Sequence, residues 1–214
     1  ARRCRPGGGA GRGPPAVPDA VSVALSMSQY GLRSYRFHPA DAAQVLARER
    51  YLQVVYRECF ADPPWSEDEA QVASFPQRLA QQMAHPGAHG IIVERDGRVV
   101  AAIYGWPAGD TLPAGTAFDD ALAAAAPRHV LAALTAPALV VAELMVHPAH
   151  RRKGIARALL TRYVSRWPRA WLCTHPQAPA VALYESMGWR RQFDFVVGEF
   201  SLVLYLWQAD HPPA

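Results

Sequence analysis

The chain has 214 residues, of which 50% are hydrophobic and 19% are charged, and its formal net charge is +4. Such a length and composition are typical of one globular domain with or without an extension, and they exclude wholesale disorder and a coiled coil. No apolar run reaches the roughly 18 residues of a membrane span, so we expect no membrane association. Three scattered cysteines, Cys4, Cys59 and Cys173, fit no disulfide framework and favour the cytoplasm.

Residues 1–26 differ in composition from the rest of the chain, with five glycines, four prolines and four arginines. This composition predicts a disordered tail, and the absence of an apolar segment argues against a secretory signal. Met27 is a candidate native start, in which case residues 1–26 do not belong to the natural protein. We therefore expect a single domain over 27–214.

The first half of this domain predicts two helices between strands. Residues 32–37 indicate a short strand, and Asp41 is the expected N-cap of a helix that ends near Phe60. Ser66 and Glu69 form a capping-box pattern, which predicts a second helix to about residue 84. Asp96-Gly97 then joins two strands, 90–94 and 98–106, in a predicted hairpin.

The second half begins with a long connection, 107–137, that contains two short Ala-rich helical pieces and that we expect to act as a lid. An apolar run over 138–146 predicts a buried central strand. A helix over 155–167, a strand over 170–174, a helix over 178–187 and strands near 189–195 and 198–207 follow. The class is therefore α/β (α+β), with a mixed, mostly antiparallel sheet of about seven strands flanked by about four helices.

A basic loop connects the predicted central strand to the helix that starts at Ile155. Backbone N–H groups at a helix N-terminus lack intrahelical partners and carry partial positive charge. Gly154 and Ala156 keep bulky side chains away from the backbone, and Arg151, Arg152 and Lys153 add positive charge. This pattern predicts an anion-binding loop, although neither a Walker A loop nor a dinucleotide fingerprint is present.

Positive charge is concentrated around this loop. Residues 144–184 contain seven Lys or Arg residues and no Asp or Glu, which favours a polyanionic ligand over a solvated basic helix start. A nucleic-acid binder that uses 151–169 and the tail is an alternative. No recognition-fold signature accompanies these arginines, and we expect no nucleic-acid partner.

Glu143 lies inside the apolar central strand, where an unpaired carboxylate is costly. Such an acid is either paired, for example with an arginine on a neighbouring strand, or used as a base whose pKa is raised by burial. The nearby His147 and His150 are separated by Pro148 and joined by no Cys, Asp or Glu. We therefore predict no metal site.

Two segments together resemble the GNAT superfamily of acyl-CoA-dependent N-acetyltransferases. Arg151-x-x-Gly154-x-Ala156 resembles motif A of that family, and Ala180-x-x-Leu183-Tyr184-Glu185-x-x-Gly188-Trp189 resembles its motif B. The order of predicted elements also matches, and the resemblance covers residues 32–207. One departure is Gln177, where the family often has Asn.

The resemblance implies acetyl-CoA as co-substrate and a direct transfer to an amine. It implies that Glu143 is the general base and that Tyr184 protonates the leaving thiolate. Backbone amides of 152–157 would hold the pyrophosphate, arginines would lie near the 3′-phosphate, and the 144–146 backbone would pair with the pantetheine arm. The candidate cofactor contacts are Leu144, Met145, Val146, Arg151, Arg152, Lys153, Gly154, Ile155, Ala156, Arg157 and Gln177.

The acceptor amine is expected opposite the cofactor, near the first helix–helix turn and the hairpin. The candidate wall consists of Phe60, Asp62, Trp65, Tyr104 and Trp106. Acidic residues in this half favour a small cationic amine over a merely solvated acidic surface. A protein N-terminus or lysine acceptor, and a non-catalytic acyl-CoA-binding module, remain alternatives, and the chain is expected to be a monomer or a homodimer.

Overall fold

The computed structural model describes residues 32–209 and contains one seven-stranded sheet in the order β1-β2-β3-β4-β5-β7-β6. The predictions about residues 1–26 and Met27 lie outside this part of the chain. Only β4 and β5 pair in parallel; the other neighbours are antiparallel, which confirms the predicted mixed, mostly antiparallel sheet. The strands are β1 (Arg36–Asp41), β2 (His89–Arg95), β3 (Arg98–Pro107), β4 (Leu139–Val146), β5 (Arg169–Thr174), β6 (Arg190–Val197) and β7 (Phe200–Gln208).

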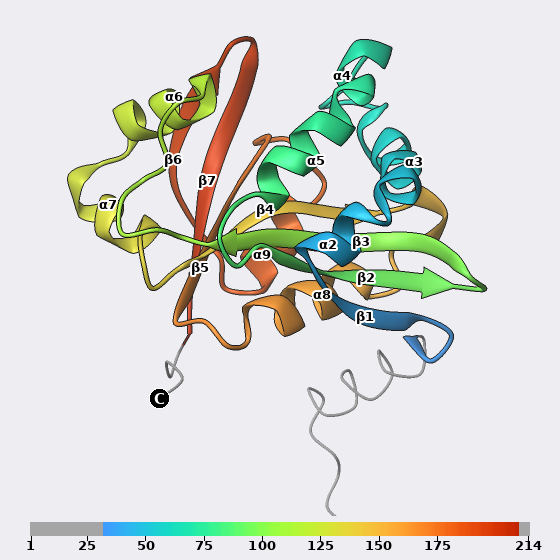
Figure 1. Ribbon diagram of the computed structural model, residues 1–214. Helices are drawn as coiled ribbons and strands as arrows, with labels where there is room; N and C mark the ends of the chain where they lie inside the picture. Colours follow the sequence, from blue (N-terminus) through green and yellow to red (C-terminus); the bar gives the residue numbers. More distant parts are fainter. Residues whose placement is uncertain (1–31, 210–214) are drawn as a thin grey trace, which may run out of the picture.

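Three groups of helices cover the sheet (Figure 1). The α-helices within residues 32–209 are α2 (Ala42–Leu46), α3 (Glu49–Phe60), α4 (Glu69–Ala73), α5 (Phe75–Met83), α6 (Ala117–Ala125), α7 (Arg128–Leu134), α8 (Ile155–Val164) and α9 (Val181–Ser186). Helices α2, α3 and α5 pack over β2, β3 and β4, whereas α8 and α9 lie on the opposite face. Helices α6 and α7 pack on the β5–β7–β6 end.

The first predicted helix is two helices. Asp41 is the N-cap, as predicted, and its carboxylate accepts from the N–H of Gln44 in a capping box. Helix α2 nevertheless ends at Leu46, and the carbonyl of Arg48 becomes the first acceptor of α3. No Gly or Pro marks this break, so sequence periodicity could not reveal it.

The second predicted helix starts at a different cap and is also divided. Asp68, not Ser66, forms the capping box, with Gln71; Ser66 has a left-handed φ of 48°. Pro76 then occupies the first turn of α5, where its missing N–H costs no hydrogen bond. Because Pro76 cannot donate to the carbonyl of Val72 and its ring would clash with that carbonyl in a continuous helix, α4 and α5 are separate.

The first strand begins later in the chain than predicted, whereas the hairpin lies where it was predicted. The first strand is β1 (Arg36–Asp41) rather than 32–37, and it includes Pro39, which an edge strand tolerates because it needs no N–H on its outer side. The hairpin is as predicted, with positive φ at both Asp96 and Gly97, as a type I′ turn requires.

The 107–137 connection is packed against the sheet through its two helices. Leu122, Val130 and Leu134 are at most 3% exposed and form a core with Trp171 of β5 and Phe195 of β6. This core lies beside a second one under α3 and α5, and Trp106 contacts both. No helix within 32–209 is long and apolar enough to span a membrane.

Candidate active site

The parallel strands β4 and β5 pair only at their first residues. The paired positions are Leu139 with Ala170 and Val140 with Trp171; further on, Glu143 to Val146 have only β3 as a partner strand. The N–H of His147 donates to Val100 in the β3 direction. Since backbone groups alternate in direction along a strand, the N–H and C=O of Val146 face the gap between β4 and β5.

The predicted base is re-aimed by a β-bulge in β4. Tyr104 opposes Glu143 and Gly105 opposes Val141, so Ala142 has no opposite residue. A bulge reverses the alternation of side chains along a strand. It allows the strand to approach Gly105 closely, since a Cβ there would lie 1.9 Å from the Val140 carbonyl oxygen.

Glu143 has an unpaired carboxylate. Within residues 32–209 no hydrogen bond or ion pair reaches it, and its oxygens are not among the fully buried unpartnered atoms. Burial raises the pKa of Glu143 to about 7; the positive charge of Arg78 opposes this rise, and the negative charge of Glu67 adds to it. The structure thus shows no ion pair with an arginine on a neighbouring strand, and the carboxylate can exchange a proton near neutral pH.

Tyr184 lies on the opposite side of the sheet, in the core beneath α8. Its side chain is 5% exposed, and its hydroxyl makes no hydrogen bond within the described chain, yet the oxygen is not fully buried. Burial, with a smaller contribution from the charge of Glu143, raises the pKa of Tyr184. The phenol therefore stays protonated and can donate a hydrogen bond.

The basic loop forms a turn at the N-terminus of α8. Arg152 and Gly154 have left-handed φ angles of 62° and 83°, and no side chain caps the first N–H groups of the helix. Arg151 turns back to donate to the Val146 carbonyl at 3.1 Å, and Arg157 donates to Ser186 at 2.7 Å. These two arginines therefore connect the loop to β4 and α9, whereas the exposed Arg152 points its charge to solvent.

The predicted acceptor residues separate into three places. Phe60 and Trp65 contact each other, and Trp65 also contacts His175 after β5, at a centroid distance of 5.7 Å. Tyr104 lies next to Glu143 and is 1% exposed. Trp106 stacks on His85 at 4.0 Å. Asp62 and Gln177 are exposed.

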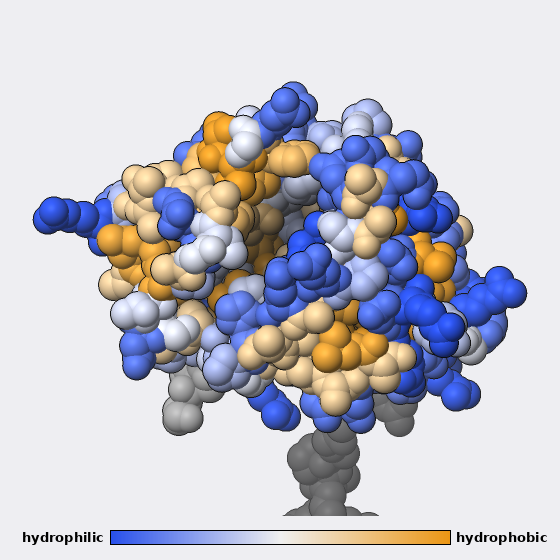
Figure 2. Space-filling view, turned by 45° about the horizontal axis from the view of Figure 1, so that its top comes forward, coloured by the Kyte–Doolittle hydropathy of each residue, from blue (hydrophilic) through white to orange (hydrophobic). Residues whose placement is uncertain are grey.

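The face above β4 is hollowed between two raised parts (Figure 2). The α6–α7 side of the hollow is mainly apolar and the α3–α5 side is mainly hydrophilic. The acids expected in this half are Asp62, Glu67, Asp68, Glu69, Asp110, Asp119 and Asp120. Three of them serve other purposes: Asp68 and Asp119 cap helices, and Glu69 pairs with Arg57 at 2.9 Å. Glu67 is the acid of this group that acts on Glu143.

Sequence reasoning counted Glu67, in the α3–α4 connection, only among the acids of this half and missed the polar groups around it that act on Glu143. They are Tyr56 of α3 and Arg78 of α5. Arg78 lies beside Leu79, which is fully buried, in a helix whose apolar face begins at Phe75. A cation bordering an apolar face is the one sequence signal that could have found this cluster.

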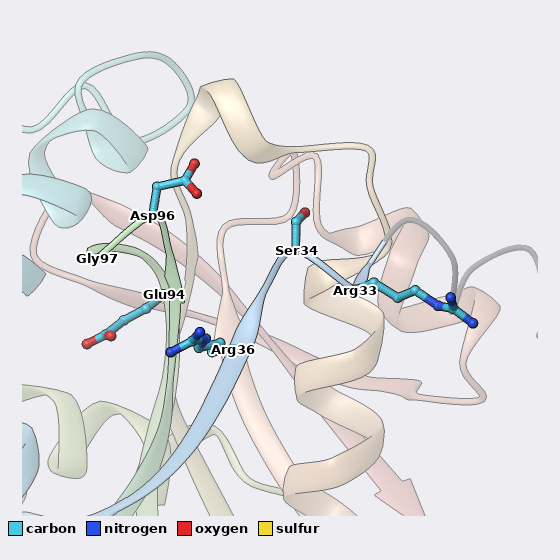
Figure 3. A pocket seen from close by; sticks show the side chains of 6 residues that line it. All are labelled: Arg33, Ser34, Arg36, Glu94, Asp96 and Gly97. Atoms are coloured by element: carbon cyan, nitrogen blue, oxygen red, sulfur yellow. The ribbon is translucent and has the colours of Figure 1, made fainter.

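A second hollow lies at the tip of the β2–β3 hairpin (Figure 3). Its lining consists of Arg33, Ser34, Arg36, Glu94, Asp96 and Gly97. None of the predicted site residues lines it, and no cluster of potential metal ligands was found anywhere within 32–209.

Several solved structures of acetyltransferases share this fold. The chain is similar in structure to an acetyltransferase from Thermus thermophilus, with a TM-score of 0.58, 14% identity, and coverage of 83% of this chain and 99% of that one. It is also similar to the ribosomal-protein-S18-alanine N-acetyltransferase of Escherichia coli, with a TM-score of 0.53, 14% identity, and coverage of 81% and 93%.

A third similar structure is the PaiA N-acetyltransferase of Thermoplasma acidophilum in complex with coenzyme A, with a TM-score of 0.50, 12% identity, and coverage of 80% and 98%. No curated protein sequence matches the chain. The model of the acetyltransferase (GNAT) family matches residues 51–189. This match spans more than half of the sequence and includes both motifs, and the chain belongs to the acetyltransferase (GNAT) family.

Proposed function

We propose that this chain is an N-acetyltransferase that moves an acetyl group from acetyl-CoA to a primary amine by direct transfer. The observation that carries the proposal is the gap between β4 and β5, which has the unpaired carboxylate of Glu143 on one side and the Tyr184 hydroxyl on the other. Family membership supports the acetyl-transfer chemistry.

The residues around the gap fit coenzyme A. The N–H of Val146 faces the gap and is suited to an extended amide-containing arm, which would add to β4 like a strand. The uncapped N-terminus of α8 and the exposed Arg152 and Lys153 suit a pyrophosphate. The coenzyme A complex of the similar Thermoplasma enzyme supports the same choice of ligand.

In the proposed mechanism, the chain holds amine and thioester together, which supplies part of the acceleration through proximity. Glu143 takes a proton from the ammonium, directly or through water, and the free amine then attacks the thioester carbonyl. The Val146 N–H stabilises the negative charge that develops on the oxygen of the thioester carbonyl. The attacking nitrogen loses its second proton to solvent, and as the C–S bond breaks Tyr184 donates its proton to the thiolate. Glu143 then releases its proton to solvent, and Tyr184 is reprotonated from solvent.

The acceptor in this proposal is a small cationic amine. Phe60 and Trp65 provide aromatic surface, and Glu67 and Glu143 provide negative charge, a combination that suits an ammonium group. A protein N-terminus is the second candidate, because the similar Escherichia coli enzyme is by its name an N-acetyltransferase for an alanine of ribosomal protein S18.

A thiol-release assay with acetyl-CoA and a panel of amines tests the proposed function. Diamines, amino acids and short peptides with free N-termini would be compared, with acetylated products identified by mass spectrometry. We expect amine-dependent release of coenzyme A with at least one class. Acetyl-CoA binding without any amine-dependent release would instead indicate a non-catalytic acyl-CoA-binding module.

A further inference from the structure

We propose that Glu67 and Arg78 are positioning residues that control the charge of Glu143 from opposite directions. Arg78 favours the carboxylate anion, and Glu67 favours its neutral form. This inference rests on the proposed function for its catalytic meaning, but the ionisation of Glu143 can be measured without any acceptor.

The two residues are held above β4 by Tyr56. The Tyr56 hydroxyl donates a hydrogen bond to Oε1 of Glu67, and the Arg78 guanidinium lies over the Tyr56 ring, 4.8 Å from its centroid. Tyr56 itself is 2% exposed and packs on Phe60 and Phe75. A rigid, buried ring therefore fixes one acidic and one basic side chain, and this ring shares a core with Tyr104, the residue opposite Glu143 on β3.

Each of these charged groups has polar capacity that the described chain does not use. Oε2 of Glu67 and Nη2 of Arg78 are buried and have no hydrogen-bond partner within 32–209, and Oε1 of Gln82, one turn after Arg78, is in the same condition. Buried polar atoms are normally partnered. Glu67 and Arg78 thus form no ion pair with each other within the described chain, and neither charge is neutralised by a direct partner there.

Arg78 and Glu67 are the charged side chains that act on Glu143 from the elements packed around it. Tyr56 and Cys59 face it from α3, Tyr104 from β3 and Tyr184 from α9. The pKa values of these four groups are raised, mainly by burial, so they are neutral at physiological pH. Among the groups of residues 32–209 named here, Arg78 and Glu67 are the charged ones that act on Glu143.

This arrangement suits a base that must alternate between two charge states. The Glu67 anion attracts an ammonium to the site, but without Arg78 it would also hinder the ionisation of Glu143. The Arg78 cation compensates for that hindrance. Removal of the Arg78 charge should therefore raise the pKa of Glu143, and removal of the Glu67 charge should lower it.

Carbon-13 NMR of protein labelled at the glutamate carboxyl carbons tests this inference. The Glu143 resonance is the one that Glu143→Gln removes. We expect Arg78→Gln to raise its titration midpoint, and Glu67→Gln to lower it, each by on the order of one pH unit. Arg78→Lys keeps the charge and should move the midpoint less than Arg78→Gln does.

Matched controls come from the exposed Arg57–Glu69 pair on neighbouring elements. Arg57→Gln and Glu69→Gln make the same charge changes near the solvent and should leave the midpoint unmoved. Shifts of the same sign for Arg78→Gln and Glu67→Gln, or shifts no larger than in the controls, would overturn the inference. If Arg78→Gln does not fold, the other two variants still test the inference. Glu67→Gln should lower the titration midpoint of Glu143, and Arg78→Lys should leave it nearly unchanged.

The outcomes separate this inference from the proposed function. Absence of amine-dependent thiol release removes the proposed function and leaves the titration result intact. Normal acetyl transfer with unmoved midpoints removes the role of Arg78 and Glu67 alone.

Discussion

The two sides of the β4–β5 gap are built in different ways. The proposed cofactor side comes from one continuous stretch, from Leu144 through the loop at Gly154 to α8, with α9 following. The acceptor side is assembled from α3, the α3–α4 connection, α5 and β3, which are brought together over β4. A contiguous site leaves a motif in the sequence, whereas an assembled site leaves only scattered residues.

The two sides also differ in charge. On the cofactor side, cations surround an open helix N-terminus. On the acceptor side, the charges that act on Glu143 are the cation of Arg78 and the acid of Glu67. The comparison predicts that substitutions on the acceptor side change the chemical step, and that substitutions in the loop change acetyl-CoA binding.

The largest expected effect is that of Glu143→Gln. Loss of the base should lower kcat/KM for the amine by about 10²–10⁴-fold, while acetyl-CoA affinity measured by calorimetry stays nearly unchanged. Glu69→Gln, which alters an exposed acid outside the gap, is the control. Turnover by Glu143→Gln within a few-fold of the wild type would contradict the role of the base.

Tyr184→Phe should reduce kcat by roughly 10²-fold, because the leaving thiolate loses its proton donor. The apolar ring keeps the packing of this 5% exposed position, so KM for acetyl-CoA should change little. Steady-state kinetics with saturating amine measures both values. An unaltered kcat would exclude Tyr184 as the acid.

Gly154→Ala tests the loop. A side chain at φ 83° costs about 1–2 kcal/mol, and any displacement of the helix N-terminus should raise KM for acetyl-CoA by roughly tenfold with a smaller change in kcat. Gly97→Ala has a similar φ of 74° in the distant hairpin and is the control. It should lose comparable stability and keep its KM; equal KM values for the two variants would count against the loop as the binding site.

The pH dependence should show activity and stability moving in opposite directions. With the pKa of Glu143 at about 7, kcat/KM should rise with pH and level off above that value. The folded pKa exceeds the unfolded value of about 4.3, so Glu143 contributes stability below about pH 4 that is lost as pH rises through the folded pKa. Urea denaturation of the wild type should show that the free energy of unfolding falls by on the order of 2 kcal/mol over this pH range. Glu143→Gln should lack this fall; an equal dependence of the unfolding free energy on pH in both proteins would contradict the raised pKa of Glu143.

Much of the fold followed from local patterns in the sequence. The Asp96-Gly97 hairpin, the Asp41 cap and the apolar run of β4 each depend on a few adjacent residues, and the structure confirmed them. The capping boxes at Ser66 and Asp68 overlap, and only the fold of the preceding turn, in which Ser66 bonds to the Asp62 carbonyl, selects Asp68. The helical spacing of apolar residues also continues across the break between α2 and α3, so it predicted a single helix there.

The site was predictable to the extent that it is contiguous. The placement of Glu143 in an apolar strand and the motifs at Gly154 and Tyr184 were visible in the sequence. The action of Arg78 and Glu67 on Glu143 was not, because it depends on how α3 and α5 pack over β3 and β4. The bulge at Ala142, which aims Glu143, depends equally on the pairing with Gly105.

The most direct test of the account is a crystal structure of the Glu143→Gln variant with acetyl-CoA. We predict that the pantetheine arm lies in the β4–β5 gap beside Val146, that the pyrophosphate lies on the N–H groups of 152–157, and that the acetyl group lies between residue 143 and Tyr184. Acetyl-CoA bound outside the gap, or with its acetyl group distant from both residues, would contradict the account.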